Sequence, residues 1–423
     1  MGAVLDLAES MWQGVAPADH VMRSAHALVG GFVGIDEVAR GVAFVGSFAN
    51  VTAIDTDEGL VLIDVGSPLL AARVRQAVRS WTSRPLHAAV YTHGHVDHVF
   101  GFGAYEDEPR AHTAATPYVL AHAAVAQRFD RYRMTAGYNG HINMRQFRLP
   151  APLFPEDFRY PDRTFVDTHV LELGGERIEL HHARGETDDH AWAWMPSRGV
   201  LATGDLFIWA APNCGNPQKV QRYPIEWARA LRQMAALGAS VLCPGHGPPI
   251  LGADRVAQAL GDAATLLETL HEQTVAAMNT GARLDEVVAS VVVPERLLQR
   301  PYLRAVYDKP EFIVRNLWRL YGGWYDGNPA HLKPAREHVL ASELATLAGG
   351  ATRLCERARA LLDAGELALA CHLVEFAALA APADLGIRRV RGEIYRARAD
   401  ASTSLMAQGI FEAAARESDG DGS

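Results

Sequence analysis

The sequence has little cysteine and no long apolar run, and each absence excludes a class of protein. The 423 residues include four cysteines, none of them in C-x-x-C spacing: Cys214, Cys243, Cys355 and Cys371. Reduced thiols fit this scatter better than a disulfide scaffold or a zinc ribbon. No apolar stretch has the length that spans a bilayer, and MGAVLDLAES lacks the basic start and apolar segment of a secretory signal. We therefore predict a cytoplasmic protein without a membrane span.

Basic charge is also scarce. Lysine and arginine total 40 against 49 aspartates and glutamates, and no basic run concentrates the positive charge. Nucleic acids and anionic membranes need a concentrated basic face, so neither is expected as a partner. The G-x-S-x-G turn of a serine hydrolase is missing as well. The length and the 49% hydrophobic content allow two or three domains with a large core.

The sequence does contain a dense set of metal ligands. Thr92-His93-Gly94-His95-Val96-Asp97-His98 follows the apolar run from Leu86 to Tyr91. In a turning backbone His93 and His95 project to the same side and can reach one cation, while Asp97 and His98 can serve a second. This mixture of ligands suits zinc best, with iron or manganese as alternatives. The alternative is a histidine-rich surface turn that binds no metal, which the density of potential ligands disfavours.

Three further motifs follow short apolar runs that are expected to be buried strands: GETDDH at residues 185–190, TGD at 203–205 and CPGHG at 243–247. With H-x-H-x-D-H they occur in the order found in the metallo-β-lactamase superfamily, which this chain resembles. That resemblance implies a site with two metal ions and two catalytic aspartates, Asp97 and Asp205. It assigns His93, His95 and His190 to one ion, Asp97, His98 and His246 to the other, and Asp205 to a position between them.

The GETDDH motif departs from the family pattern. Many members have G-H-T-P-G-H at this place, so the sequence here loses a proline and gains carboxylates. Asp189 is therefore the alternative to His190 as a ligand. The family also implies that Asp64, at the end of an apolar run, orients a metal-bound histidine from behind.

The remaining patterns predict an α+β chain. The resemblance implies an αββα metallo-β-lactamase sandwich at residues 1–280, followed by an all-α domain at 281–423. Short strands at 42–47, 51–55 and 60–65 form a meander, and a helix from Ser67 to about Ser80 precedes a strand at 87–91. Alanine, leucine and arginine recur at helical spacing after about residue 253. Residues 315–334 resemble the signature of the alkylsulfatase dimerisation domain, which implies a homodimer.

These resemblances predict a binuclear zinc hydrolase that acts on sulfate esters. Two cations about 3.5–4 Å apart share a water and lower its pKa, so that a metal-bridging hydroxide attacks the ester. In the alkylsulfatases glutamates replace the bridging Asp205 and the ligand His190, and a further C-terminal domain, which we expect this chain to lack, helps to hold the alkyl tail. Lactonase, thioesterase, phosphodiesterase and β-lactamase activities are alternatives on the same fold, and a non-catalytic metal-stabilised scaffold is another.

The substrate is expected to be a small anionic ester with an apolar part. A long stretch from about residue 109 to 167, rich in aromatic residues and arginines, is expected to cover the site as a loop. Arg222 is the first candidate to bind the sulfate group and Arg145 the second, because a guanidinium presents a planar fork to the anion. The other candidates are Asn143 and Asn216 for binding, Lys219 as a weaker cation, and His141 as an acid for the leaving oxygen.

Overall fold

The computed structural model describes residues 2–15, 31–106, 108 and 116–420 and divides into two compact units. The first unit comprises Met1–Asn139 and Phe154–Gly323, and the second comprises Gly140–Leu153 and Trp324–Ser423. Residues 281–323, which the boundary predicted from sequence assigns to the second domain, thus belong to the first unit. Their apolar residues Ile313, Val314 and Leu317 are buried in the same core as the preceding long helix, which explains the difference.

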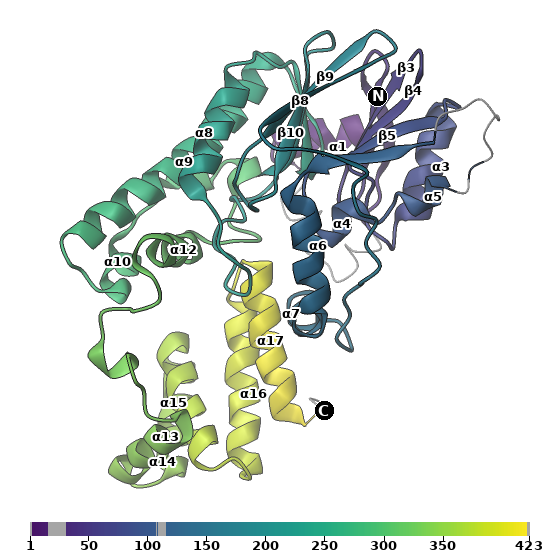
Figure 1. The fold of residues 1–423 in the computed structure, drawn as a ribbon. Coiled ribbons are helices and arrows are strands. Elements are labelled where there is room, and N and C mark those ends of the chain that lie inside the picture. Colours follow the sequence, from purple (N-terminus) through teal and green to yellow (C-terminus); the bar gives the residue numbers. More distant parts are fainter. Residues whose placement is uncertain (1, 16–30, 107, 109–115, 421–423) are drawn as a thin grey trace. The chain divides into compact units, whose positions relative to one another are not determined.

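One sheet of the first unit has the strand order β1-β2-β3-β4-β5-β6-β7 (Figure 1). Strands β1 to β4 pair antiparallel, which confirms the predicted meander, and β4 to β7 pair in parallel. The strands are β1 (Gly34–Ala39), β2 (Val42–Gly46), β3 (Val51–Thr56), β4 (Gly59–Ile63), β5 (Leu86–Tyr91), β6 (Tyr118–His122) and β7 (Arg163–Phe165).

The second sheet has the order β13-β12-β11-β10-β9-β8. Only β11 and β12 pair in parallel there among the described strands. The strands are β8 (Thr168–Leu173), β9 (Glu176–His182), β10 (Ala191–Met195), β11 (Val200–Ile208), β12 (Val241–His246) and β13 (Ile250–Leu251).

Strand β10 shows how the two sheets become a sandwich. Successive side chains of a strand point to opposite faces. Ala191, Ala193 and Met195 enter the core between the sheets, whereas Trp192 and Trp194 enter the core shared with the covering helices. Helices therefore lie outside the second sheet, helix α3 (Ala71–Trp81) packs against β1 and β2 of the first, and the predicted αββα sandwich is confirmed.

The helices of the first unit include α8 and α9, which lie beside the second sheet (Figure 1). The predicted helix at 67–80 begins later, at Ala71, after a turn at residues 68–70. The bounds are α1 (Ala3–Trp12), α3 (Ala71–Trp81), α4 (Val96–Val99), α5 (Gly103–Glu106), α6 (Ala124–Met134), α8 (Pro224–Ala235), α9 (Ala253–Asn279), α10 (Leu284–Ser290), α11 (Glu295–Leu298), η1 (Pro301–Leu303) and α12 (Pro310–Gly322).

The stretch at 109–167 is not the covering loop that the sequence suggested. Its described part contains β6, α6, β7 and a further helix, α7 (Ala136–Phe147). Residues 109–115 lie outside the described residues. Helix α6 forms because Val125, Phe129 and Tyr132 recur at helical spacing and are all buried on one face.

The second unit is helical, as predicted for this part of the chain. Small side chains such as Ala358, Ala370 and Ala377 are buried in its core, which lets its helices pack closely. No helix in the described ranges combines the length and apolar character that crossing a bilayer requires. The bounds are η2 (Pro329–His331), α13 (Glu337–Ala348), α14 (Ala351–Asp363), α15 (Leu367–Ala380), α16 (Leu385–Asp400) and α17 (Leu405–Asp419).

Candidate metal centre

The predicted ligands meet where strands of both sheets end. His93 and His95 follow β5, Asp205 lies in β11, and His246 ends β12. Close approach of the two segments requires Gly204, whose φ is 49° and whose added Cβ would stand 2.5 Å from the hydroxyl oxygen of Thr92. A larger residue at Gly204 would therefore push β11 away from the histidine turn.

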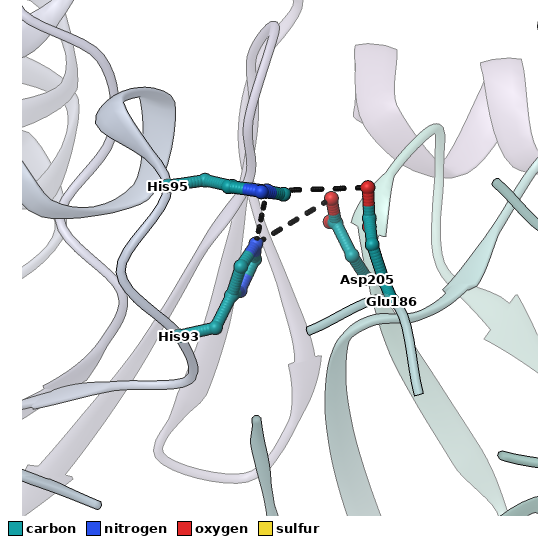
Figure 2. A group of neighbouring side chains, drawn as sticks. All are labelled: His93, His95, Glu186 and Asp205. Carbon is teal, nitrogen blue, oxygen red and sulfur yellow. Dashed lines mark hydrogen bonds and ion pairs between the residues drawn. The ribbon is translucent and has the colours of Figure 1, made fainter. Parts of the chain in front are cut away.

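A first group of ligand atoms, called cluster 1 below, comprises His93, His95, Glu186 and Asp205 (Figure 2). Their donor atoms all lie within 4.8 Å of one another. His93 Nε2 is 2.8 Å from His95 Nδ1 and 3.7 Å from Asp205 Oδ2, and His95 Nδ1 is 4.0 Å from Glu186 Oε1. These atoms converge from three separate segments of the chain.

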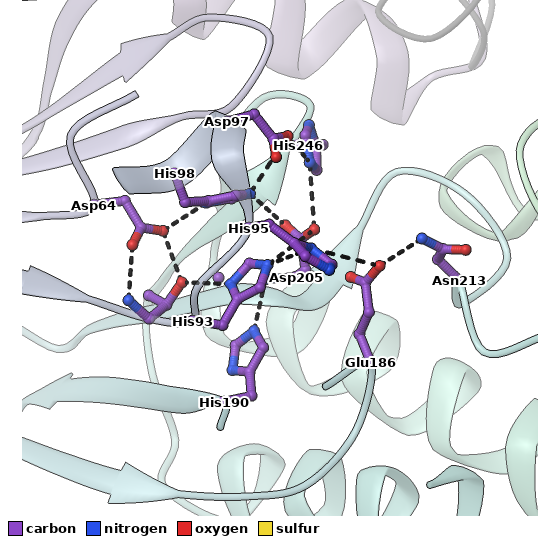
Figure 3. Close-up of polar contacts among 12 residues, drawn as sticks. Asp64, His93, His95, Asp97, His98, Glu186, His190, Asp205, Asn213 and His246 are labelled. Carbon is purple, nitrogen blue, oxygen red and sulfur yellow. Dashed lines mark hydrogen bonds and ion pairs between the residues drawn. The ribbon is translucent and has the colours of Figure 1, made fainter. Parts of the chain in front are cut away.

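A second group, cluster 2, comprises Asp97, His98 and His246. Asp97 Oδ2 is 3.7 Å from His98 Nε2 and 3.4 Å from His246 Nε2. Asp205 reaches this cluster too, with Oδ1 3.2 Å from His98 Nε2 and Oδ2 3.3 Å from His246 Nε2. Asp205 therefore contacts both clusters, as Figure 3 shows.

The donor sets fit divalent cations. His98 Nε2 and Asp205 Oδ1 are buried and face each other, yet neither has a hydrogen-bond partner among the described residues. A buried acceptor without a partner is costly, and a cation between the two atoms would satisfy both. Imidazole nitrogens with carboxylate oxygens are ligands that zinc accepts, and iron and manganese accept them as well.

The histidines of cluster 2 are held from behind. Asp64 has a left-handed φ of 59°, and its carboxylate accepts from Thr92 N at 2.7 Å and the Thr92 hydroxyl at 2.8 Å. His98 Nδ1 lies 2.8 Å from the same carboxylate, and His246 Nδ1 contacts the carbonyl oxygen of Phe48. These contacts leave Nε2 of each ring directed at the cluster.

The two clusters differ in the electrostatics of their rings. Burial lowers the pKa of His93 and His95 well below the ordinary value, and neighbouring positive groups, His98 for the first and Arg128 for the second, lower it further. Burial would also lower the pKa of His98 and His246, but Asp205 and other carboxylates outweigh it. The pKa of His98 rises well above its usual range and that of His246 to about 9.

His190, the ligand implied by the family pattern, does not join cluster 1. Its Nε2 accepts from the backbone N–H of Asp205 at 3.1 Å, and its ring stacks on His93 with the centroids 4.6 Å apart. Its role as a ligand stays a prediction.

Glu186 occupies the place in cluster 1 that the sequence analysis gave to His190. Its Oε1 accepts from Arg222 Nη1 at 2.6 Å and from Asn213 Nδ2 at 2.5 Å, while its Oε2 is buried without a partner among the described residues. Burial raises the pKa of Glu186 to about 8 despite Arg222. The sequence signal is present, since this glutamate stands in the GETDDH motif. The superfamily pattern, however, assigns the ligand of this motif to its histidine.

Two of the predicted substrate residues, Arg222 and Asn216, are buried within the first unit. The Arg222 side chain is 3% exposed and donates to Glu186 and to the carbonyl oxygen of Asn213, and its part in substrate binding stays a prediction. Asn216 is buried and shapes the next turn, where its Oδ1 accepts from Gln218 N at 3.0 Å and its carbonyl oxygen from Lys219 N at 3.3 Å.

The other predicted substrate residues belong to the second compact unit. Asn143 and Arg145 lie on α7, within the segment Gly140–Leu153, as does His141. Asn143 Nδ2 donates to the carbonyl oxygen of Leu153 at 3.2 Å inside this unit. Their part in substrate binding stays a prediction.

Known families match both parts of the chain. The family described as the metallo-beta-lactamase superfamily matches residues 45–246, and the one described as alkyl sulfatase dimerisation matches residues 283–421.

Curated relatives match most of the chain but are longer. A linear primary-alkylsulfatase of a Pseudomonas species is 26% identical over 389 residues, which cover 87% of this chain and 73% of the relative. An (R)-specific secondary-alkylsulfatase, also from Pseudomonas, is 27% identical over 377 residues, covering 82% and 56%. The chain thus spans little more than half of the second relative's length.

One solved structure shares the fold over nearly the whole chain. It is the stereoselective inverting sec-alkylsulfatase Pisa1 from Pseudomonas, with a TM-score of 0.80 and 24% identity over 92% of this chain and 66% of that one. At this identity the likeness concerns the fold.

Proposed function

Because the chain joins a metallo-β-lactamase superfamily domain to an alkyl sulfatase dimerisation domain, we propose that it is a binuclear zinc-dependent hydrolase of sulfate esters. The observation that carries this proposal is the pair of donor clusters joined by Asp205, whose carboxylate faces ligand atoms of both. When bound, two divalent cations supply an activated water and positive charge for the ester oxygens.

The residues of the chain hold this arrangement in place. Asp205 sets the distance between the clusters, and Asp64 keeps the ring of His98 oriented. The Asp97 carboxylate lies close to both His98 and His246, so it can hold a cation or a proton at cluster 2. No side-chain nucleophile is required by this chemistry.

Lys219 is the better candidate to bind the sulfate group, since Arg222 is occupied by Glu186. Lys219 is partly buried and forms no ion pair with any residue in the described ranges, and its charge interacts with those of Asp97 and Glu186. Burial lowers the pKa of Lys219 to about 8, and Arg222 contributes to the same shift. An ammonium next to the cations would bind the oxygens of the anion that the cations leave free.

A substrate panel tests the proposal. The zinc-loaded protein is assayed against alkyl sulfates of several chain lengths, lactones, thioesters, phosphodiesters and cephalosporins. We expect hydrolysis of at least one alkyl sulfate, with loss of the activity in a chelator and its return with Zn²⁺. Faster hydrolysis of a lactone or thioester than of every sulfate would replace the sulfatase proposal by another activity on this fold.

A non-catalytic scaffold predicts a different result, namely zinc binding without hydrolysis of any substrate. Glu179→Gln is the control for substitutions at the metal ligands, because this glutamate pairs with Arg177 and His181 away from both clusters. Its activity should equal that of the wild type.

We also propose a homodimer in the cytoplasm. Helix α13 of the second unit exposes Val339, Leu340 and Leu347, an apolar surface that a second copy of the chain would cover. Light scattering should give twice the chain mass, and Leu340→Glu with Leu347→Glu should give the mass of one chain. The four free cysteines fit a reducing compartment.

A further inference from the structure

Asp189 connects two segments that supply cluster 1, although it contributes no ligand atom to it. Its side chain is fully buried, and its Oδ2 accepts from the backbone N–H of Gly94 at 3.0 Å. Gly94 is the residue between His93 and His95. The Asp189 carboxylate is therefore hydrogen-bonded to the peptide group that sets the separation of the His93 and His95 rings.

Asp189 is itself held by a buried arginine from another element. Arg128, on helix α6, lies with its Nε 2.8 Å from the same Oδ2, and its side chain is 2% exposed. A second carboxylate, Asp188, pairs with the same guanidinium but is 44% exposed. The Arg128 guanidinium thus fixes the Asp189 carboxylate. That carboxylate fixes the turn that carries His93 and His95.

The packing around this contact leaves little room for adjustment. A Cβ added at Gly94 would stand 2.7 Å from Arg128 Cδ and 3.0 Å from Asp189 Oδ2. The turn, the carboxylate and the arginine therefore pack as one unit. Because Asp189 lies three residues after Glu186 in the same loop, a shift of Asp189 would move ligands of cluster 1 on both sides.

We propose that Asp189, held by Arg128, is a positioning residue that keeps the His93–His95 turn and the Glu186 loop in register, and so sets the metal affinity of cluster 1. The inference depends on the proposed function only in taking cluster 1 as a metal site. Groups that orient a ligand from behind change metal affinity by about ten- to a hundredfold when they are removed.

The test measures Zn²⁺ affinity by competition with a chromophoric chelator for Asp189→Ala and Asp189→Asn. We expect one of two ions to bind about ten- to a hundredfold more weakly and the other to bind as in the wild type. Asp189→Asn, which keeps an acceptor for Gly94, should lose less than Asp189→Ala. With Co²⁺ in place of zinc, the visible spectrum of one site should change.

Asp188→Asn is the matched control, since it removes a carboxylate from the same arginine without touching Gly94. Its zinc affinity should stay at the wild-type value. Equal weakening in Asp188→Asn and Asp189→Ala would overturn the proposal, as would wild-type affinity for both ions in Asp189→Ala.

A paired variant covers the case in which Asp189→Ala fails to fold because Arg128 is left unpaired. Arg128→Met with Asp189→Leu removes both charges and still lacks the acceptor for Gly94. Weak binding of one ion in a folded paired variant supports the proposal, and wild-type binding overturns it. Wild-type protein that binds two zinc ions but hydrolyses no sulfate ester would sink the proposed function and leave this inference intact.

Discussion

Clusters 1 and 2 lie side by side and share Asp205, but the protein holds them in different ways. In cluster 2, His98 and His246 each direct Nδ1 at a fixed acceptor, the carboxylate of Asp64 and the carbonyl oxygen of Phe48. In cluster 1, Glu186 belongs to a loop that is attached by buried ion pairs, one of them to Arg222.

The difference shows where each cluster is vulnerable. A hydrogen bond behind a ring orients it, so its loss weakens metal binding while the fold persists. A buried ion pair that loses one partner leaves an uncompensated charge, so its loss also endangers the fold. Substitutions around cluster 2 should therefore change metal affinity, and those around cluster 1 should change stability as well.

The largest effect is expected for Asp205→Ala, which removes the residue common to both clusters. Without this carboxylate His98 and His246 lose the group that faces them, and cluster 1 loses one donor. We expect kcat/KM for a sulfate ester to fall by about 10³- to 10⁶-fold, the scale of removing a principal catalytic group. Elemental analysis should find fewer than two zinc ions per chain. Two ions retained at wild-type affinity would contradict the bridging role.

Arg222→Ala should show how much the ion pair between Arg222 and Glu186 contributes to the unfolding free energy. At pH 9, where the carboxylate is charged, Glu186 would be left buried without its cation, which costs about 3–5 kcal/mol of unfolding free energy for a pair of this kind. Denaturant unfolding of the metal-free protein measures the loss. Arg222→Met together with Glu186→Met should recover most of it, since both charges are then gone. Stability equal to the wild type in Arg222→Ala would show that the pair contributes nothing.

Asp64→Asn should act mainly on cluster 2, because Asp64 contacts His98 directly and reaches His93 of cluster 1 only through Thr92. The amide can no longer accept from both Thr92 and His98 as a carboxylate does, so we expect zinc to bind there about ten- to a hundredfold more weakly. Chelator competition measures the affinity, and the exposed Asp57→Asn is the control. The comparison fails if the ion lost is the one bound by His93 and His95.

The smallest effect concerns Lys219, which belongs to neither cluster. Its ammonium is charged below its pKa of about 8 and neutral above it, so kcat/KM for a sulfate ester should fall as the pH rises through about 8. Lys219→Ala should raise KM about tenfold, the loss of one charge-assisted contact near solvent, and should flatten this limb of the pH profile. An unchanged pH profile in Lys219→Ala would remove the residue from substrate binding.

All three residues of cluster 2, and every residue of cluster 1 except Glu186, could be predicted from the sequence. His93, His95, Asp97 and His98 lie within six positions after one strand, and such short spacing limits where their side chains can point. The motifs that contain Asp205 and His246 each follow an apolar run, and the family resemblance assigned both residues to the site. The meander and the helical second part likewise follow from local periodicity, whereas the sandwich was implied by the family resemblance.

Which of Glu186 and His190 faces His95, and which carboxylate pairs with Arg222, depended on the tertiary structure. Glu186 and His190 stand four positions apart in one loop, and only packing decides which side chain reaches His95 and which one stacks on His93. Arg222 looks like an anion clamp in sequence because a guanidinium suits sulfate and carboxylate equally. Its partner comes from 36 positions away in the chain, a contact that no local pattern encodes. The sequence by itself determined which ligand types are present and where the strands deliver them, since both depend on neighbours in the chain. The tertiary structure decided which charges are already paired, because that depends on which distant segments become buried together.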